Sequence, residues 1–329
     1  MTLFGEDSTN PSTWQLRQSF RQIADLKFQT ADRLIRYEVH VELDTSTEKL
    51  HVEQEKVELR YSVTPPLEWP PSRQVLIRAS GSVHFNTEAT GFYESTRKDF
   101  HRNFASINSL PSDADFPATA WLREQLRGGI KSVLLDLDHL RHPSPPATTD
   151  RSDMKGSYLA RSIAQLRSRH AVDFSDWMAH VRTVLPDVKD IRTDLKEADR
   201  HRYVVIDYEN GVSVPSWMLS DGTLRLLALT ILAYLPDFTG VYFVEEPENG
   251  VHPAALQAIY DSLSSVYAGQ VLVTSHSPVL LGLAQPEQLL CFAKTPGGTG
   301  IVRGSEHQAL QNWKGEVSLG TLAASGILG

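Results

Sequence analysis

The segment VYFVEEPENGVHP (residues 241–253) decides the expected fold, because an apolar run leads directly into two adjacent glutamates. Residues 241–244 show no polar alternation, which indicates a strand buried on both faces, as in a parallel sheet. The carboxyl ends of such strands open into the crevice where α/β proteins bind ligands. We therefore expect Glu245 and Glu246 to lie at the mouth of a ligand site. A strand that ends in two glutamates is a weak signal alone, so its neighbours decide the interpretation.

The C-terminal third repeats this pattern, with helices between apolar strands. The expected elements are a helix at 221–235, a strand at 241–245, a helix at 253–267, a strand at 270–274, a helix at 278–284 and a strand at 288–293. Apolar strands that alternate with amphipathic helices predict a parallel sheet covered on both faces. The predicted fold class is therefore α/β, with a parallel-dominated sheet.

The N-terminal part of the chain has a different pattern. A weakly helical segment is expected over residues 14–28, and polar and apolar residues then alternate over about 34–87. This alternation is typical of antiparallel strands, and the segments LIRYEVHVEL, LHVEQEKVELRY, QVLIRAS and SVHFNT carry it. We expect three parts: an N-terminal helix with an antiparallel β subdomain (1–94), a helical insert (95–200) and a C-terminal lobe (201–329).

The predicted insert contains several helices. One, in FPATAWLREQLRGGI, is expected to end at residues 128–129, because two consecutive glycines disfavour helix. Two more are expected at 157–169 and 173–185. After the second, the Asn-Gly pair at 210–211 predicts the turn of a β-hairpin.

Composition bounds the class of protein. The 329 residues are 41% apolar, enough for a substantial core, and the single cysteine, Cys291, excludes an internal disulfide. We expect a cytoplasmic protein, since no charged-then-apolar leader opens the chain and the longest apolar run, 226–235, falls short of the roughly 20 residues of a membrane span. The net charge of -8 gives no global attraction for nucleic acid. Basic clusters at 97–102 and 167–170 are local candidates, although solvated helix faces explain them as well.

Two further motifs flank the glutamates. VLVTSHSP carries an apolar strand into His276, which is placed to hydrogen-bond a terminal phosphate; the alternative is a capping or core histidine. MLSDGTLRLLALTILAYL places Ser220, Gly222 and Thr223 at the start of a long helix. Free N–H groups and the dipole at a helix start favour an anion such as phosphate, and an ordinary N-cap is the alternative.

Together and in this order, the three motifs resemble the ATP-binding heads of ABC and SMC-like ATPases, in particular the stand-alone AAA family ATPases of bacterial defence operons. LSDGTLR resembles the signature motif, VYFVEE the Walker B strand, PENGVHP the D-loop and TSHSP the switch-histidine motif, with matching spacing and order over 216–284. The resemblance extends more weakly to MKGSYLARSIAQLRS, LPDVKDI and GEVSLGTLAASGILG. It implies a P-loop NTPase-like head that uses ATP and Mg²⁺.

The resemblance also implies roles for single residues. In such heads two protomers sandwich ATP, so Glu245 would position Mg²⁺, Glu246 would activate the attacking water and His276 would contact the γ-phosphate. The remaining implied contacts are Ser220, Gly222 and Thr223 on ATP held by the partner protomer, and Asn249 and His252 at the dimer interface. The implied partners are a second copy of the chain and an effector protein from the same operon, with DNA contact through that effector and no membrane.

One expected motif is absent from the sequence. The phosphate-binding loop of such heads, G-x-x-x-x-G-K-[ST], should precede the other motifs, yet no glycine in the chain is followed by lysine. The fragment GGIKS at 128–132 lacks the Gly-Lys step and follows the β-rich segment. We expect an N-terminally incomplete head, through truncation or a late start. The alternatives are a loop supplied by another polypeptide and a degenerate partner, and retention of Glu246 and His276 argues against degeneration.

The predicted function is ATP binding and hydrolysis coupled to dimerisation, which drives a partner effector and, by the resemblance, serves anti-phage defence. The alternative is a non-catalytic subunit whose signature helix completes a partner's ATP site. A nuclease of the related overcoming-lysogenization-defect group is disfavoured, because no extra domain follows residue 300.

Overall fold

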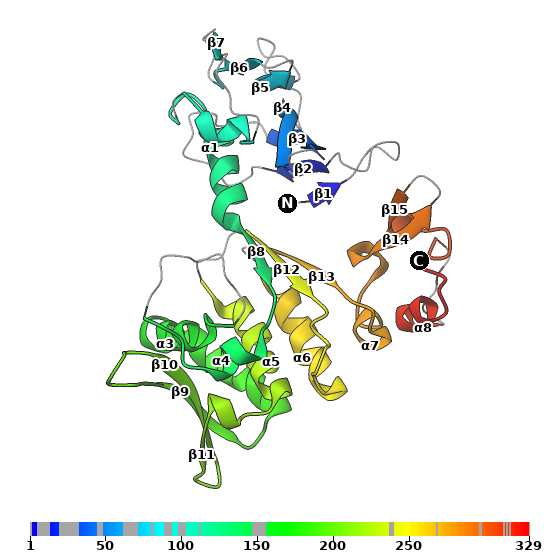
Figure 1. Cartoon of the computed structure of the whole chain (residues 1–329). Helices are drawn as coiled ribbons and strands as arrows, with labels where there is room; N and C mark the ends of the chain where they lie inside the picture. Colours follow the sequence, from blue (N-terminus) through cyan, green and yellow to red (C-terminus); the bar gives the residue numbers. More distant parts are fainter. Residues whose placement is uncertain are drawn as a thin grey trace. The chain divides into compact units, whose positions relative to one another are not determined.

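The chain folds into two compact units. The computed structural model describes residues 2–4, 14–19, 33–44, 49–61, 72–79, 82–88, 94–97, 103–111, 113–146, 156–236, 240–267, 269–295, 298–311, 313, 315 and 317–328. Unit 1 comprises Met1–Arg127 and Ala293–Ile301, and unit 2 comprises Gly128–Phe292 and Val302–Gly329 (Figure 1). No helix in the described ranges combines the length and the apolar character needed to cross a membrane.

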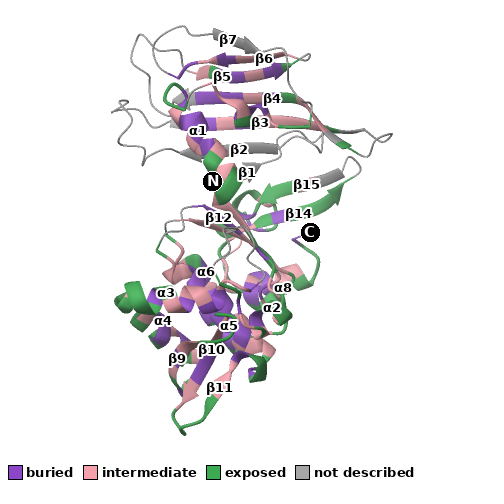
Figure 2. Cartoon of the chain, turned by 60° about the vertical axis from the view of Figure 1, so that its left-hand side comes forward, coloured by how far each residue is buried: buried purple, intermediate pink, exposed green. Residues whose placement is uncertain are grey.

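Unit 1 is built on an antiparallel sheet in which each strand pairs with the next along the chain. The strands are β1 (Thr2–Phe4), β2 (Trp14–Ser19), β3 (Arg33–Asp44), β4 (Lys49–Tyr61), β5 (Ser72–Ala79), β6 (Ser82–Asn86) and β7 (Glu94–Arg97). Strands β3 to β6 confirm the meander predicted over 34–87. Alternate side chains such as Val57, Leu59 and Phe85 are fully buried and form one apolar face (Figure 2).

Strand β2 occupies the start of the helix predicted over residues 14–28, so that prediction is wrong for residues 14–19. Residues 20–32 lie outside the described part of the chain. Strand β2 pairs with β3, with Trp14 opposite Val39 and Ser19 opposite Leu34. Helix propensity is a weak preference in a short polar segment, and pairing with a long neighbouring strand overrides it.

Two helical segments pack on the apolar face of this sheet, η1 (Ser106–Ser109) and α1 (Pro117–Glu124). Helix α1 continues as a π-helical turn, η2 (Gln125–Gly129), so the helix predicted to end at residues 128–129 is confirmed. At the other end of α1, the N-cap residue Phe116 supplies no side-chain acceptor. The first amide groups of this helix therefore need an acceptor from elsewhere in the fold.

Glu88 is that acceptor. Its carboxylate is 2% exposed and accepts hydrogen bonds from the amide groups of Ala118 and Thr119, both at 2.8 Å. It also accepts the Thr119 hydroxyl at 2.6 Å. A carboxylate at a helix N-terminus is further stabilised by the helix dipole. Glu88 thus fastens α1 to the sheet across 30 residues of sequence.

Replacing Glu88 by alanine is expected to destabilise unit 1 by about 3 kcal/mol, because buried donors left without an acceptor cost ~1–3 kcal/mol each. Amide hydrogen exchange of Ala118 and Thr119 should accelerate accordingly. The matched control is Glu124→Ala, at the exposed end of the same helix, which should change stability by less than about 0.5 kcal/mol. Equal losses in the two variants would show that Glu88 does not cap α1.

Unit 2 contains the predicted parallel sheet, in the order β13-β12-β8. Its strands are β8 (Ile130–Val133), β12 (Val241–Glu245) and β13 (Gln270–Thr274), and both neighbours run parallel to β12. Strand β8 lies in the range predicted to be a helical insert. The strand predicted at 288–293 corresponds to β14 (Leu290–Thr295), which pairs with β15 (Gly298–Arg303) in a separate two-stranded sheet. Its side chains Leu290 and Phe292 are 36% and 55% exposed, so β14 lacks the burial of a central parallel strand.

A second sheet of unit 2 is antiparallel, in the order β11-β10-β9. It consists of β9 (Val188–Leu195), β10 (Arg202–Tyr208) and β11 (Ser213–Pro215), the last followed by η3 (Ser216–Met218). The hairpin of β10 and β11 confirms the turn predicted at residues 210–211, where Gly211 adopts a positive φ of 85°. The predicted helices at 157–169 and 173–185 are confirmed as α3 (Leu159–Arg169) and α4 (Ala171–Val184).

Helices fill the space around both sheets of unit 2. Besides α3 and α4 they are α2 (Leu137–Arg141), α5 (Asp221–Thr230), η4 (Ile231–Tyr234), α6 (Pro253–Ser264), α7 (Pro278–Leu281), η5 (Pro286–Gln288), η6 (Gly304–Glu306) and α8 (Leu319–Ala324). Trp177 of α4 is fully buried against α5, and its indole N–H donates to the Thr230 hydroxyl at 3.0 Å. The core is therefore centred on α5, which begins with the LSDGTLR motif.

Candidate functional site

The two adjacent glutamates lie where the central parallel strand leaves the core. In β12, Val241, Tyr242 and Val244 are at most 1% exposed, whereas Glu245 is exposed. Strand β12 is central because β8 and β13 flank it on both sides. A buried strand that opens into exposed carboxylates is what the segment at 241–246 predicted.

Glu246 has an unusual backbone conformation, with a φ of 42°. A non-glycine residue in this left-handed region costs about 1–3 kcal/mol and needs surrounding structure to hold it. Here the Glu246 amide donates to the Thr274 carbonyl at 2.9 Å, and the Glu246 carbonyl accepts the Asn249 amide at 3.0 Å. The Asn249 side-chain amide also donates to the Glu246 carboxylate at 2.5 Å. The backbone and the carboxylate of Glu246 are thus both held in place.

Both glutamates line a cleft of about 400 Å³, named here the carboxylate cleft. Its lining residues are Leu134, Leu135, Asp136, Arg225, Glu245, Glu246 and Asn249. Three of them, Glu245, Glu246 and Asn249, are site residues predicted from the sequence. Asp136 and Arg225 are additions that the structure makes.

Asp136 enters the cleft from the loop that follows β8. Because β8 and β12 are parallel, their carboxyl ends meet at one edge of the sheet. The Asp138 amide donates to Asp136 at 2.9 Å, and the His139 Nδ1 lies 2.9 Å from its other oxygen. The Asp138 hydrogen bond, followed by the one to His139, holds the pKa of Asp136 below its ordinary value, so it remains a carboxylate. The sequence signal was present, since SVLLD also carries an apolar run into an acid.

Arg225 brings a positive charge into the cleft from α5. Its Nε atom is buried and has no hydrogen-bond partner among the described residues. A buried donor without an acceptor is costly. The positive charge of Arg225, which lines the cleft, would attract an anionic ligand. Arg225 closes the LSDGTLR stretch, in which the sequence reasoning selected only the residues before it.

His276 approaches the same carboxylates from the turn after β13. Its Nε2 lies 4.0 Å from a carboxylate oxygen of Glu246, and its side chain is 91% exposed. The space between the His276 ring and the Glu246 carboxylate is therefore open to solvent. A ligand bound there could contact both side chains.

Glu248 holds the turn that carries His276. One oxygen of its carboxylate accepts the Ser275 hydroxyl at 2.7 Å and the amide groups of His276 and Ser277, both at 3.1 Å. These bonds join the turn after β12 to the turn after β13. The sequence reasoning missed Glu248, because its contacts lie 27 to 29 residues away along the chain.

His276 and the remaining predicted site residues lie outside the lining of the carboxylate cleft. Ser220 caps α5, accepting the Thr223 amide at 3.2 Å, and the two hydroxyls are 2.8 Å apart. A Cβ on Gly222 would come within 3.2 Å of the Gly250 carbonyl oxygen, so the start of α5 packs closely against the loop after β12. His252 caps α6 by accepting the Ala254 amide at 3.2 Å. Both Ser220 and His252 are exposed.

The carboxylates of the cleft suit a hydrated magnesium ion. Mg²⁺ keeps several waters and binds proteins through one or two carboxylates, so it needs no preformed cage. Glu245 and Asp136 place carboxylates of this kind around one cleft, with Glu246 beside them. In the part of the chain that the structure describes, no three acidic, histidine or cysteine side chains gather into a compact metal-binding group.

Comparison with known proteins identifies the family to which the chain belongs. Residues 50–282 match the family model described as "AAA domain, putative AbiEii toxin, Type IV TA system". No curated protein matches the chain.

Several solved structures are similar at low identity. They include a structure titled "Structural biochemistry of ATP-driven dimerization and DNA stimulated activation of SMC ATPases" (17% identity, 46% of this chain and 93% of that chain, TM-score 0.35). A second is an SMC head bound to the C-terminal winged-helix domain of ScpA (14% identity, 86% and 79%, TM-score 0.41). A third is the Pyrococcus furiosus SMC head bound to the C-terminal domain of ScpA (11% identity, 86% and 81%, TM-score 0.36). Similarities of this size say nothing about the ligands or partners of this chain.

Proposed function

The chain belongs to the family described as AAA domain, putative AbiEii toxin, Type IV TA system. We propose that it is an ATP-binding and ATP-hydrolysing head that drives a partner effector protein. The observation that supports this most directly is the carboxylate cleft. Glu245 and Glu246 line it at the end of the central parallel strand, and His276 lies 4.0 Å from Glu246. A metal ligand, a group able to orient water and a phosphate sensor are the parts that phosphoryl transfer requires.

In this proposal each side chain has one task. Glu245 holds Mg²⁺ through its water shell, and Glu246, oriented by Asn249, positions the attacking water. His276 hydrogen-bonds the γ-phosphate. Arg225 lines the same cleft and adds positive charge where negative charge must be neutralised.

The proposal needs phosphate-binding groups that this sequence does not carry. A P-loop provides a series of backbone N–H donors and a lysine for the β- and γ-phosphates, and no Gly-Lys step occurs among the 329 residues. We propose that residues encoded upstream, or a second polypeptide, supply this loop. Bound ATP would then lie between the loop and the carboxylate cleft.

Dimerisation around ATP is the second part of the proposal. Ser220 and His252 are exposed beside Gly222 and Asn249, at the start of α5 and in the loop after β12. These positions are open to ATP and to the surface of a second copy of the chain. The dimer would drive an effector encoded with it, and the proposed role of the pair is defence. The family description itself names a type IV toxin–antitoxin system.

The experiment compares the chain as printed with the product of the same gene read from any upstream in-frame start. Phosphate release and molecular mass by light scattering are measured with and without Mg²⁺-ATP. The longer product is expected to hydrolyse ATP and to double its mass with ATP. Binding without hydrolysis would favour the non-catalytic subunit instead, and a longer product that contains a P-loop yet fails to bind ATP would overturn both.

A further inference from the structure

A second cleft of unit 2, of about 670 Å³, lies beside α3 and the β9–β10 pair. Its lining residues are Arg161, Ala164, Gln165, Arg167, Ser168, Arg169, Arg192, Thr193 and Arg202. Five of these nine are arginines and none is acidic or aromatic. This arginine cleft shares no residue with the carboxylate cleft, so it requires a separate explanation.

Two of the arginines form ion pairs with carboxylates of the protein itself. Arg167 donates to both carboxylate oxygens of Asp190 at 2.8 Å, and Arg192 donates to Asp207 at 2.9 Å and to Asp194. The hydrogen bonds to Asp194, and then to Asp207, raise the pKa of Arg192. These ion pairs fasten α3 to β9 and brace the β9–β10 hairpin. Their charge is largely compensated.

The other three arginines have no carboxylate partner among the described residues. Among the described residues, the Arg202 side chain donates only to the Thr193 hydroxyl, at 2.8 Å, and the Arg161 side chain only to the Pro145 carbonyl, at 3.3 Å. Arg169 is exposed and makes no hydrogen bond or ion pair there. Three positive charges thus face one cleft in a chain whose net charge is -8.

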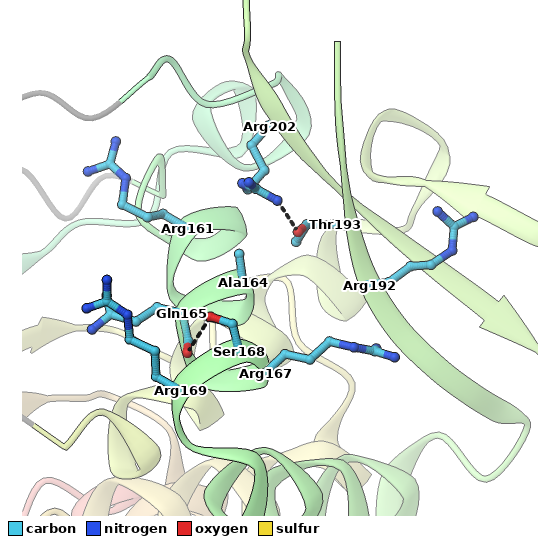
Figure 3. Close-up of a pocket in the computed structure, with 9 residues that line it drawn as sticks. All are labelled: Arg161, Ala164, Gln165, Arg167, Ser168, Arg169, Arg192, Thr193 and Arg202. Carbon is cyan, nitrogen blue, oxygen red and sulfur yellow. Dashed lines mark hydrogen bonds between the residues drawn. The ribbon is translucent and has the colours of Figure 1, made fainter. Parts of the chain in front are cut away.

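The arrangement of these three side chains suits an extended polyanion. Arg161 and Arg169 are eight residues apart on α3, which places their Cα atoms about 12 Å apart along the helix axis. Figure 3 shows both extending to the same side of α3, with Arg202 reaching in from the neighbouring strand. Charges spread along a helix in this way suit a row of phosphates. The Thr193 hydroxyl and the Gln165 amide provide neutral donors beside the charges, whereas the Ser168 hydroxyl donates to the Gln165 carbonyl.

We propose that the arginine cleft binds the phosphodiester backbone of duplex nucleic acid directly. Arginine side chains are the usual ligands of backbone phosphates, and such contacts carry no sequence preference. Proteins that bind single strands stack bases on aromatic side chains, and this cleft has none in its lining. The duplex is therefore the form of nucleic acid that the cleft fits.

The test measures binding of a fluorescein-labelled 30-base-pair DNA duplex by anisotropy, over a range of salt concentrations and without ATP. The triple variant Arg161→Gln, Arg169→Gln, Arg202→Gln is expected to bind about tenfold more weakly or worse. The salt dependence should also become weaker. The magnitude of the negative slope of log K against log salt should fall by about 2 to 3, since each lost phosphate contact removes about 0.9. Two duplexes of unrelated sequence should give the same result.

Two matched variants separate the site from general charge and from misfolding. The triple lysine variant at the same positions keeps the charge and should retain most of the binding. Replacing Arg127, Lys196 and Lys294, which are exposed outside the cleft, by glutamine removes the same charge and should leave the salt slope unchanged. Absence of duplex binding by the unmodified chain would overturn the proposal. So would equal binding by the triple glutamine variant, or an equal loss in the control variant.

Discussion

Replacing Glu246 by glutamine is expected to lower the rate of ATP hydrolysis about 10²- to 10⁴-fold, the usual contribution of a positioned acid or base. Glutamine keeps the size of the side chain and one oxygen for the Asn249 amide, so the turn should remain folded. What it loses is the negative charge that polarises water. Binding of Mg²⁺-ATP should survive, because Glu245 and not Glu246 is the proposed metal ligand.

The measurement is steady-state phosphate release, with molecular mass followed in the presence of ATP. In the form of the protein that hydrolyses ATP, the variant should accumulate as an ATP-bound dimer, because the step that would separate the protomers no longer occurs. Glu209→Gln is the matched control, since Glu209 is an exposed glutamate beyond β10. It should keep full activity. A variant at position 246 that retains most of the wild-type rate would remove Glu246 from the mechanism.

The sequence predicted the parts of the fold that depend on neighbouring residues. Strands β12 and β13 and helix α6 between them follow from apolar runs and an amphipathic segment, and β3 to β6 follow from strict alternation. In β12 the apolar run reflects burial, because a strand buried on both faces has no room for a polar residue. Strand β13 lies at the edge of the described sheet instead, and its Val273 is 40% exposed, so the burial expected there is wrong. The same reasoning placed Glu245 and Glu246 at the end of β12, where the structure has them.

The features that could not be predicted from the sequence depend on contacts between segments that are distant along the chain. Strand β8 is only four residues long and follows a helix, so its sequence has no period to recognise. Asp136 shares a cleft with Glu245 only because β8 pairs with β12. Likewise, the apolar residues of β14 gave no sign that the strand would pair with β15 outside the parallel sheet.

Loss of Glu248, which lies outside the lining of the carboxylate cleft, is expected to harm hydrolysis through the turn that carries His276. Glu248→Ala leaves three donors of the Ser275–Ser277 turn without their acceptor. Hydrogen bonds to a charged acceptor are worth about 1.5–3 kcal/mol each, so the turn should open locally. His276 would then lose its fixed distance to Glu246. We expect kcat to fall about 10- to 100-fold, since each 1.4 kcal/mol of lost positioning costs a factor of ten.

The conservative variant distinguishes positioning from general damage to the fold. Glu248→Gln retains an oxygen for the same three donors, so it should recover most of the activity that alanine loses. Since Glu248 itself does not line the carboxylate cleft, KM for ATP should change little in either variant. Amide exchange of His276 and Ser277 should be fast in the alanine variant and near normal in the glutamine variant. If alanine instead raises KM and leaves kcat intact, Glu248 acts on binding, and the coupling of the two turns to hydrolysis is wrong.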